Sequence, residues 1–338
     1  MKKITTIILT AFFSLPGITY AQSIANEIIA SGTELIELFD GGEGFLLEGP
    51  CMSPSGELFF TDIPFTMFSG LKAGIIWKYN LESKEPTVFR SPSGMANGMA
   101  FDADGNLIVC EGADFGGQRV IRTDMSTGKS EIIAGLYNGE PFNGPNDVVI
   151  DESGRIYFTD PRYFGHEPIE QKVMGVYRID NQGKVELIIA NASNPNGIII
   201  SPDQKSLYIA NFAVPGNYEF PTANFTGVRQ VSEGEILAYD LLQDGSVKFR
   251  KELINLGNLG PDGMTIDMEE NLYIAHGNKV GIYNNQGEKL YEIEIPKSPV
   301  SNLTFGREKY SKTLFITAGK SLFSIQTQKE GYHIPFNK

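Results

Sequence analysis

One short pattern recurs six times along this chain, and an oxygen-bearing side chain stands at the same place in every copy. The copies read EGPCMSPSGELFFTD, NGMAFDADGNLIVCE, NDVVIDESGRIYFTD, NGIIISPDQKSLYIAN, DGMTIDMEENLYIAH and NLTFGREKYSKTLFITA. The six key positions are Glu48, Asn97, Asn146, Asn196, Asp262 and Asn302. Successive key positions lie 49, 49, 50, 66 and 40 residues apart. Repeats of about 40–50 residues built from short strands are typical of β-propeller blades, so we expect six blades around one axis.

Each repeat carries the pattern of a small antiparallel sheet. In the third, the apolar runs Val148–Ile150 and Ile156–Thr159 flank the turn Glu152–Gly154, which is the signature of a β-hairpin. A third and a fourth apolar run follow in most repeats, as in GVYRIDNQGK and VELIIAN. No segment shows a sustained helical stripe. We therefore predict an all-β, six-bladed β-propeller, with an array of two β-sandwich domains as the alternative.

Repeat symmetry would bring the six key side chains together around a central channel. They offer two carboxylates and four amide oxygens, and oxygen-only sets suit a hard cation, Ca²⁺ first and Mg²⁺ second, with Mn²⁺ or Zn²⁺ also open. Asn-Gly and Asp-Gly pairs also form turns, which is the alternative explanation for the key residues. Because Glu48 is a poor turn former, we predict a shared metal site of Glu48, Asn196 and Asp262, joined by Asn146. Asn97 and Asn302 are weaker candidates for metal ligands, since a catalytic cation keeps coordination positions open for water and substrate.

The first 21 residues have the pattern of a secretory signal peptide. Lys2 and Lys3 precede the apolar stretch 4–15, and Thr19-Tyr20-Ala21 forms a small-residue cleavage site. The apolar stretch is short for a membrane span and is followed by Pro16. We expect cleavage after Ala21, a single propeller domain over 22–338, a periplasmic or secreted destination and no membrane association after cleavage.

The net charge argues against one class of function, and the cysteine content bears on whether a disulfide forms. The chain has 338 residues and a formal net charge of −13, with no Lys/Arg cluster, which argues against nucleic-acid binding. The two cysteines, Cys51 and Cys110, stand at different depths in neighbouring repeats. An oxidising compartment permits a disulfide between them, but two buried thiols acting as small apolar residues are the favoured interpretation.

Two long connections interrupt the repeat. They span residues 161–174 and 212–234, and both are rich in aromatic side chains. Insertions in a rigid repeat scaffold usually lie on the binding face, so we expect walls or a lid over the channel mouth. In the first, Arg162, Tyr163 and His166 are candidate substrate contacts. His276 is a second candidate for the mouth, and no role is expected for His333 in the tail.

The motifs together resemble the SMP-30/gluconolactonase/luciferin-regenerating-enzyme family. The resemblance runs from about residue 35 to 325 and rests on EGPCMSPSGELFFTDI, GPNDVVIDESGRIYFTDPRY, PNGIIISPDQKSLYIAN and GPDGMTID. It implies a six-bladed propeller with one divalent cation in the channel, and lactone hydrolysis as the activity. It places the metal ligands at Glu48, Asn196 and Asp262. It also implies that Asn146 lies next to both the metal and the substrate.

One position departs from the family pattern. Animal members carry an arginine two residues before the Asn of the ND motif, where it contacts sugar lactones, and this chain has Gly144 there. Arg162 is the candidate to replace that cation. The form PNDVV…FTDPRY is closer to the bacterial lactonases of the family.

The resulting hypothesis is a secreted, calcium-dependent hydrolase of lactones. Asp262 would act as general base, Glu48 mainly as a metal ligand, and Asn97 and Asn146 would contact the substrate. The alternatives are another reaction at the same metal, such as phosphotriester hydrolysis or sugar-acid isomerisation, and a non-enzymatic propeller stabilised by Ca²⁺ that binds a ligand or protein.

Overall fold

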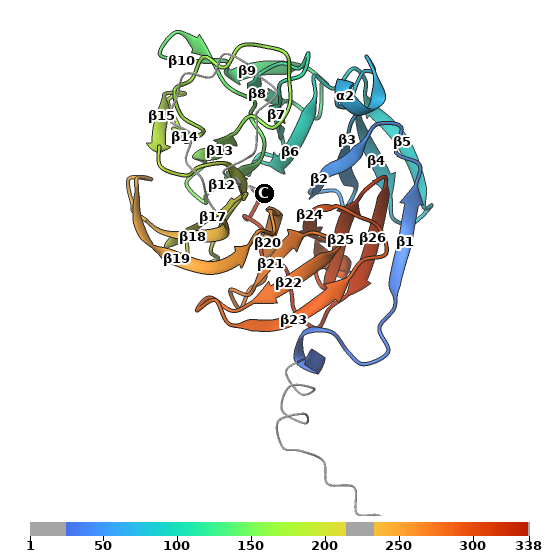
Figure 1. Cartoon of the computed structure of the whole chain (residues 1–338). Coiled ribbons are helices and arrows are strands. Elements are labelled where there is room, and N and C mark those ends of the chain that lie inside the picture. Colours follow the sequence, from blue (N-terminus) through green and yellow to red (C-terminus); the bar gives the residue numbers. More distant parts are fainter. Residues whose placement is uncertain (1–24, 214–232, 337–338) are drawn as a thin grey trace, which may run out of the picture.

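The chain forms a ring of six four-stranded antiparallel sheets, as predicted (Figure 1). The computed structural model describes residues 25–213 and 233–336. From the axis outward, the first blade consists of β2 (Leu46–Met52), β3 (Leu58–Ile63), β4 (Ile75–Asn80) and β5 (Glu85–Arg90). The second consists of β6 (Ala96–Phe101), β7 (Leu107–Glu111), β8 (Arg119–Thr123) and β9 (Ser130–Ala134). The third consists of β12 (Val148–Ile150), β13 (Ile156–Asp160), β14 (Gly175–Ile179) and β15 (Val185–Ile189). The fourth consists of β16 (Pro195–Ile200), β17 (Ser206–Asn211), β18 (Gly234–Leu241) and β19 (Val247–Gly257). The fifth consists of β20 (Pro261–Ile266), β21 (Leu272–His276), β22 (Lys279–Tyr283) and β23 (Lys289–Glu294).

The sixth blade closes the ring with a strand from the other end of the chain. Its inner strands are β24 (Val300–Phe305), β25 (Thr313–Ala318) and β26 (Ser321–Gln326), and β1 (Leu35–Asp40) pairs antiparallel with β26 as the outermost strand. The repeat pattern did not reveal β1, because this strand precedes the first key residue. Pairing the first strand with the last protects a sheet edge and joins both ends of the ring.

Several short elements lie outside the blades. They include α2 (Thr66–Ser69), the 3₁₀ turn η1 (Glu308–Tyr310) and the two-stranded hairpin β10 (Leu136–Tyr137) and β11 (Glu140–Pro141). The signal-peptide prediction falls outside the described residues, as does the segment 214–232 of the second insertion. In the part of the chain described, no helix has the length and apolarity needed to cross a bilayer.

The hydrophobic core is divided among the six junctions between neighbouring blades. Phe59 of the first blade meets Phe101 of the second with ring centroids 5.6 Å apart, and Tyr273 of the fifth meets Phe305 of the sixth at 5.0 Å. Inner strands such as β3 are buried along their whole length, whereas the outer strand β5 is largely exposed. One closed ring of such junctions contradicts the two-sandwich alternative.

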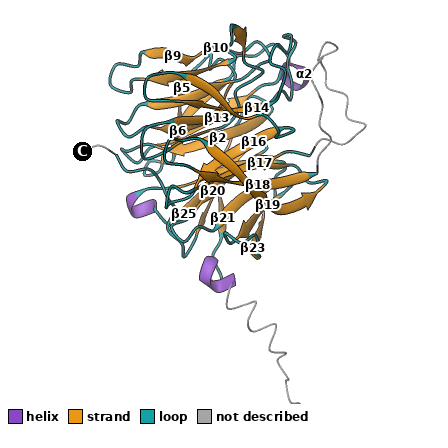
Figure 2. Cartoon of the chain, turned by 90° about the vertical axis from the view of Figure 1, so that its left-hand side faces the viewer, coloured by secondary structure: helices purple, strands orange, loops and turns teal. Residues whose placement is uncertain are grey.

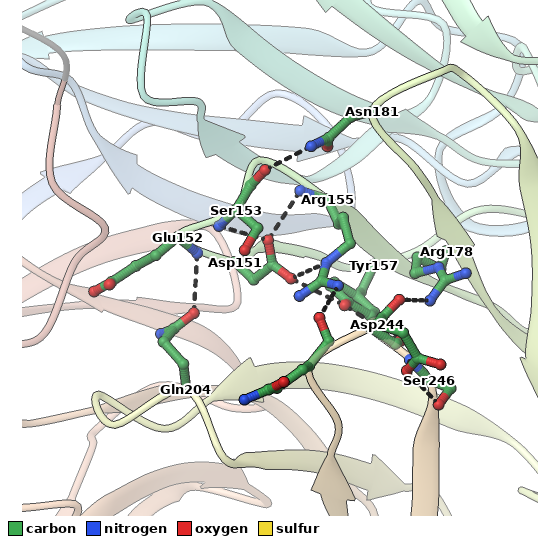
Figure 3. A network of polar contacts seen from close by, with 12 residues as sticks. Asp151, Glu152, Ser153, Arg155, Tyr157, Arg178, Asn181, Gln204, Asp244 and Ser246 are labelled. Atoms are coloured by element: carbon green, nitrogen blue, oxygen red, sulfur yellow. Dashed lines mark hydrogen bonds and ion pairs between the residues drawn. The ribbon is translucent and has the colours of Figure 1, made fainter.

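Polar contacts add to the junction between the third and fourth blades (Figure 3). The Asp151 carboxylate accepts hydrogen bonds from Arg155 Nε at 2.6 Å and from the Tyr157 hydroxyl at 3.0 Å. Arg155 Nη1 then donates to the carbonyl of Gln243 at 2.7 Å, and Arg178 Nη1 donates to that of Asp244 at 2.6 Å. Two arginines of the third blade thus hold the turn of the outer hairpin of the fourth.

The C-terminal segment 330–336, here called the strap, crosses one end of the ring. Figure 2 shows the C-terminus on the face opposite to α2. The Tyr332 amide donates to the carbonyl of Ile266 at 3.0 Å, and His333 Nε2 lies 3.0 Å from the carbonyl oxygens of Phe305 and Gly306. Ile334 packs into the core between the second and third blades. The strap covers a cavity of about 110 Å³ at this far end of the channel, and His333, expected to have no role, is part of this closure.

Candidate metal and substrate site

The six key residues stand where the innermost strands begin, with Asn146 just before β12. Pairing with the second strand slips at the key residue in most blades, as between Glu48 and Cys51, and between Pro261 and Met264. A bulge of this kind re-aims a side chain. Glu48 and Asp262 come from the first and fifth blades, which are not neighbours, yet the charge of Glu48 raises the pKa of Asp262. Side chains from such blades meet only at the axis.

The glycines that follow the key residues allow close approach of neighbouring blades. A Cβ atom at Gly49 would lie 2.0 Å from the carbonyl oxygen of Asn97, and one at Gly197 would lie 2.4 Å from that of Asp262. A Cβ atom at Gly263 would lie 2.1 Å from the side chain of Asn302. These residues are in strands. The alternative explanation of the Asn-Gly and Asp-Gly pairs as turns is therefore wrong.

Three carboxylates interact at the centre of the ring. Burial in the first place, and also the charge of Asp147, raise the pKa of Glu48 to about 8. The pKa of Asp262, which is only partly buried, is raised well above its usual value by desolvation and by the charge of Glu48. Burial raises the pKa of Asp147 to about 7. None of the three forms an ion pair with a Lys or Arg side chain of the described residues, so no cationic side chain there compensates the negative charge that they carry when ionised.

Asp147 is a site residue that the sequence reasoning missed. It occupies the place after the key residue, where four other repeats have glycine. Its carboxylate accepts the Val148 amide at 2.9 Å and the Ile198 amide at 3.4 Å. The departure from glycine in the third repeat could have revealed Asp147 as a site residue. A charged side chain stands there in place of a glycine that lets neighbouring blades approach closely.

The four amide side chains divide into different roles. The Asn302 carbonyl oxygen accepts the Leu303 amide at 2.8 Å, so the Asn302 NH₂ group is the one that faces Glu48 and Asp147. Asn302 therefore orients carboxylates. Asn196 hydrogen-bonds Asp262. The Asn97 side-chain oxygen is buried and has no hydrogen-bond partner among the described residues, which leaves it free for a cation, water or substrate.

Threonine hydroxyl groups on the second strands donate hydrogen bonds to the backbone carbonyls of key residues in the next blade. Thr159 Oγ1 of the third blade donates to the carbonyl oxygen of Asn196 in the fourth at 2.8 Å. Thr61 of the first blade does the same for Asn97 in the second at 3.1 Å. The backbone of each of these key residues is thus fixed by the preceding blade.

A second repeating polar position supports the loops that lead into the key strands. Asp62 accepts the amides of Glu43 and Gly44 at 2.7 and 2.9 Å, and Asp160 accepts those of Asn143 and Gly144 at 2.9 and 2.7 Å. His276 occupies the corresponding place in the fifth repeat and is buried, and it is not among the residues that line the mouth pocket. The recurring FTD motif was the signal for this set.

A pocket at the mouth adjoins the key residues. Its lining includes Asn97 and Asn146 together with Phe65, Met95, Tyr163 and Phe164. Two of the predicted substrate-binding residues of the 161–174 connection lie here, Arg162 and Tyr163, whereas His166 lies at the outer rim with its side chain 68% exposed, 3.1 Å from Thr66 Oγ1. The expectation that this connection forms a wall of the mouth is therefore met for Tyr163 and Phe164.

Arg162 has no donor turned freely toward a substrate. The residue is 1% exposed, and Nε donates to the Asn143 carbonyl at 2.6 Å while Nη1 donates to the Glu167 carbonyl at 2.8 Å. The prediction that it replaces the arginine missing at Gly144 is not supported by this geometry. Arg162 braces the loop instead.

The two cysteines are free thiols in different core clusters. Burial raises the pKa of Cys110 well above its usual value. This agrees with the interpretation of both as small apolar core residues.

The donor set fits a hard cation. Uncompensated carboxylates are costly to desolvate, and a divalent cation between Glu48 and Asp262 would remove that cost. Amide oxygens complete the sphere that Ca²⁺ prefers. Although these carboxylates interact electrostatically, within residues 25–213 and 233–336 no three Asp, Glu, His or Cys side chains are placed to hold one ion together, so such a site depends on the asparagines.

Comparison with known proteins agrees with the fold and the motifs. Residues 46–320 match the SMP-30/Gluconolactonase/LRE-like region. The chain therefore belongs to the SMP-30/gluconolactonase/luciferin-regenerating-enzyme family. It is 32% identical to a gluconolactonase of Zymomonas mobilis, over 84% of this chain and 79% of that protein, and 30% identical to lactonase drp35 of Staphylococcus epidermidis, over 75% and 71%.

Solved structures share the same fold. A gluconolactonase from Xanthomonas campestris superimposes with a TM-score of 0.73 at 24% identity, covering 89% of this chain and 92% of that one. Regucalcin from Agrobacterium tumefaciens, a calcium-binding protein, gives a TM-score of 0.69 at 20% identity, covering 89% and 96%.

Proposed function

We propose that this chain hydrolyses lactones with the help of one divalent cation, Ca²⁺ first, held by Glu48, Asn146, Asn196 and Asp262. The observation that carries the proposal is the meeting of Glu48 and Asp262 at the axis without a compensating Lys or Arg among the described residues. Relatives named gluconolactonase and lactonase support the reaction class.

In the proposed reaction, water adds to the lactone carbonyl, the ring C–O bond breaks and a hydroxy acid leaves. A bound cation supplies polarisation of the carbonyl and stabilises the developing oxyanion. Asp262 accepts the proton of the attacking water, because it is the partly exposed carboxylate of the pair. Glu48 is buried and serves as ligand, while Asn302 orients it. Asn97 and Asn146 contact the substrate at the floor of the mouth pocket.

Rigid support for these groups comes from the scaffold. Thr61 and Thr159 hold the backbones of Asn97 and Asn196, so neither key residue must reorganise when substrate binds. Tyr163 lines the mouth, Arg162 keeps its loop in place, and His166 contacts the substrate only at the outer rim. We further propose that residues 22–338 act in the periplasm or outside the cell after loss of the first 21 residues.

The test is hydrolysis of gluconolactone, dihydrocoumarin and an acyl-homoserine lactone by the protein lacking residues 1–21, with Ca²⁺ and with EDTA. We expect turnover of at least one lactone with Ca²⁺ and its loss in EDTA at a temperature where the fold persists. Thermal unfolding measured in parallel separates loss of chemistry from loss of structure. A protein that binds Ca²⁺ and only gains melting temperature, without turnover, would instead be a metal-stabilised binding propeller.

A further inference from the structure

The walls of the mouth pocket are aromatic, and their rings form one continuous group. Phe65 lies 4.8 Å from Phe164 between ring centroids, and Phe68 of α2 lies 5.5 Å from Phe164. Phe45 stacks on Phe68 at 4.1 Å. All four are half-buried or exposed. Phe65 and Phe164 line the pocket, and the exposed Phe68 extends the same apolar surface beside it, where a ligand can contact it.

Backbone strain is concentrated around the same pocket. Phe65, Met95, Asp114 and Phe115 have φ values of +35°, +58°, +66° and +69°. Positive φ is costly for bulky side chains and persists only where the surroundings enforce it. Both Phe65 and Met95 line the pocket. Their positions are thus maintained against a local conformational cost.

A polar network across three blades enforces these positions. Asp114 accepts the Thr66 amide at 2.6 Å and the Thr66 hydroxyl at 2.8 Å, which fixes the residue after Phe65. Glu167 in turn accepts the Asp114 amide at 3.0 Å and lies 3.7 Å from Arg162 Nη1. The loops that carry Phe65 and Phe164 are therefore braced against each other, and the aromatic walls are pre-organised.

The charged groups near the mouth do not favour a polar or anionic substrate. Arg162 is occupied by backbone carbonyls and lies beside Glu167 and Asp160. Asn97 and Asn146 supply the side-chain amides of the pocket lining, which Phe65 and Phe164 share. Hydroxyl groups of a sugar lactone directed at those walls would lose hydrogen bonds to water without replacing them.

We propose that the preferred substrate is a neutral lactone with an apolar alkyl or aryl substituent, and that Phe65 and Phe164 determine this specificity. The inference rests on the proposed lactone hydrolysis. The lactone carbonyl lies toward Asn97 and Asn146, and the substituent lies along the two rings. Burying the substituent there removes apolar surface from water on both partners.

The test compares three lactones that share a six-membered ring: δ-valerolactone without a substituent, δ-nonalactone with a butyl chain and gluconolactone with hydroxyl groups. With Ca²⁺ present, kcat/KM for δ-nonalactone should exceed that for each of the others by at least about tenfold, the lower range for apolar-pocket discrimination. Equal or higher kcat/KM for gluconolactone or δ-valerolactone would overturn this inference and leave the proposed function standing. Absence of turnover with all three would overturn this inference, and the proposed function would fall as well only if dihydrocoumarin and the acyl-homoserine lactone were also left intact.

Substitutions at Phe65 and Phe164 test whether these two residues determine the preference for the alkyl-substituted lactone. Phe65→Ala and Phe164→Ala should reduce the ratio of kcat/KM between δ-nonalactone and δ-valerolactone at least about fivefold, since most of the apolar contact is removed. Phe249→Ala is the matched control, because this half-exposed phenylalanine lies on the outer strand β19; its ratio should equal that of the wild type. Phe65→Leu and Phe164→Leu should keep most of the ratio. An unchanged ratio in both alanine variants would remove the two residues from the specificity role.

Discussion

The two ends of the central channel are built differently: one opens into a pocket with aromatic lining, and the strap crosses the other. At the mouth end, Glu48 and Asp262 share a site without a positive partner among the described residues, and Phe65 is held at positive φ. At the far end, hydrogen bonds tie the strap to the ring: His333 Nε2 lies 3.0 Å from two carbonyl oxygens, and Arg307 Nη1 donates to the Ile334 carbonyl at 3.3 Å. The carboxylate pair marks the mouth end as the proposed ligand site. The contacts between the strap and the blades mark the far end as the one that stabilises the ring.

The largest effect should come from Asp262→Asn, which removes the proposed base but keeps an oxygen ligand. We expect kcat to fall by about 10²–10⁴-fold, the usual contribution of general acid–base catalysis. Calorimetry should still detect Ca²⁺ binding, although weaker. Full turnover with metal bound would show that Asp262 is not the base.

The pH dependence of stability should also distinguish the two ends. The pKa of Glu48 is raised in the folded metal-free protein to about 8 from an ordinary 4.5, so the native state binds more protons between these values. The contribution of Glu48 to stability is then fully present below about pH 4.5 and is lost as pH rises toward 8. Ca²⁺ should reduce this slope, because it favours the ionised carboxylate. Denaturant unfolding at several pH values, with Glu48→Gln as control, measures it; an equal slope with and without Ca²⁺ would argue against a cation at Glu48.

At the far end, Ile334→Ala should lower stability without affecting the cation. The side chain packs between the second and third blades, and truncation of a buried isoleucine costs about 2–5 kcal/mol. Because the strap lies at the edge of this core, we expect the lower part of that range. Thermal unfolding gives the loss, and Ca²⁺ affinity should match the wild type. A large loss of Ca²⁺ affinity would show that the two ends are coupled.

The smallest effect should come from Thr159→Val, which removes the hydrogen bond to the Asn196 carbonyl and the one that Thr159 Oγ1 accepts from the Asp147 amide. A buried carbonyl left without its donor costs about 1–3 kcal/mol. We expect a modest loss of stability together with weaker Ca²⁺ binding, since Asn196 is a proposed ligand. Stability loss with unchanged Ca²⁺ affinity would place Asn196 outside the metal site.

The fold was largely predictable, because each blade repeats one local pattern. The hairpin predicted at Val148–Ile150 and Ile156–Thr159 corresponds to β12 and β13. The closing strand β1 was not predictable, since its pairing with β26 joins Leu35 to Ile325 across nearly the whole chain. The strap was missed for the same reason.

The site was predictable where symmetry supplies the information. The key residues converge because they repeat in register. Arg162 shows the limit: its sequence position suggested a substrate contact, but its donors are engaged by loop carbonyls that only the tertiary structure brings close. The close approach of blades at Gly49 likewise depends on packing, although its pattern resembles a turn.

The most direct test of the central claim is calorimetric titration of Ca²⁺ into metal-free wild-type protein and into Glu48→Gln. We predict one site per chain, with affinity weakened about 100-fold or more by loss of the ligand carboxylate. Hydrolysis of the preferred lactone should follow the same Ca²⁺ dependence in each protein. Equal Ca²⁺ affinity in the two proteins, or lactone turnover that persists without any cation, would contradict a catalytic metal at Glu48.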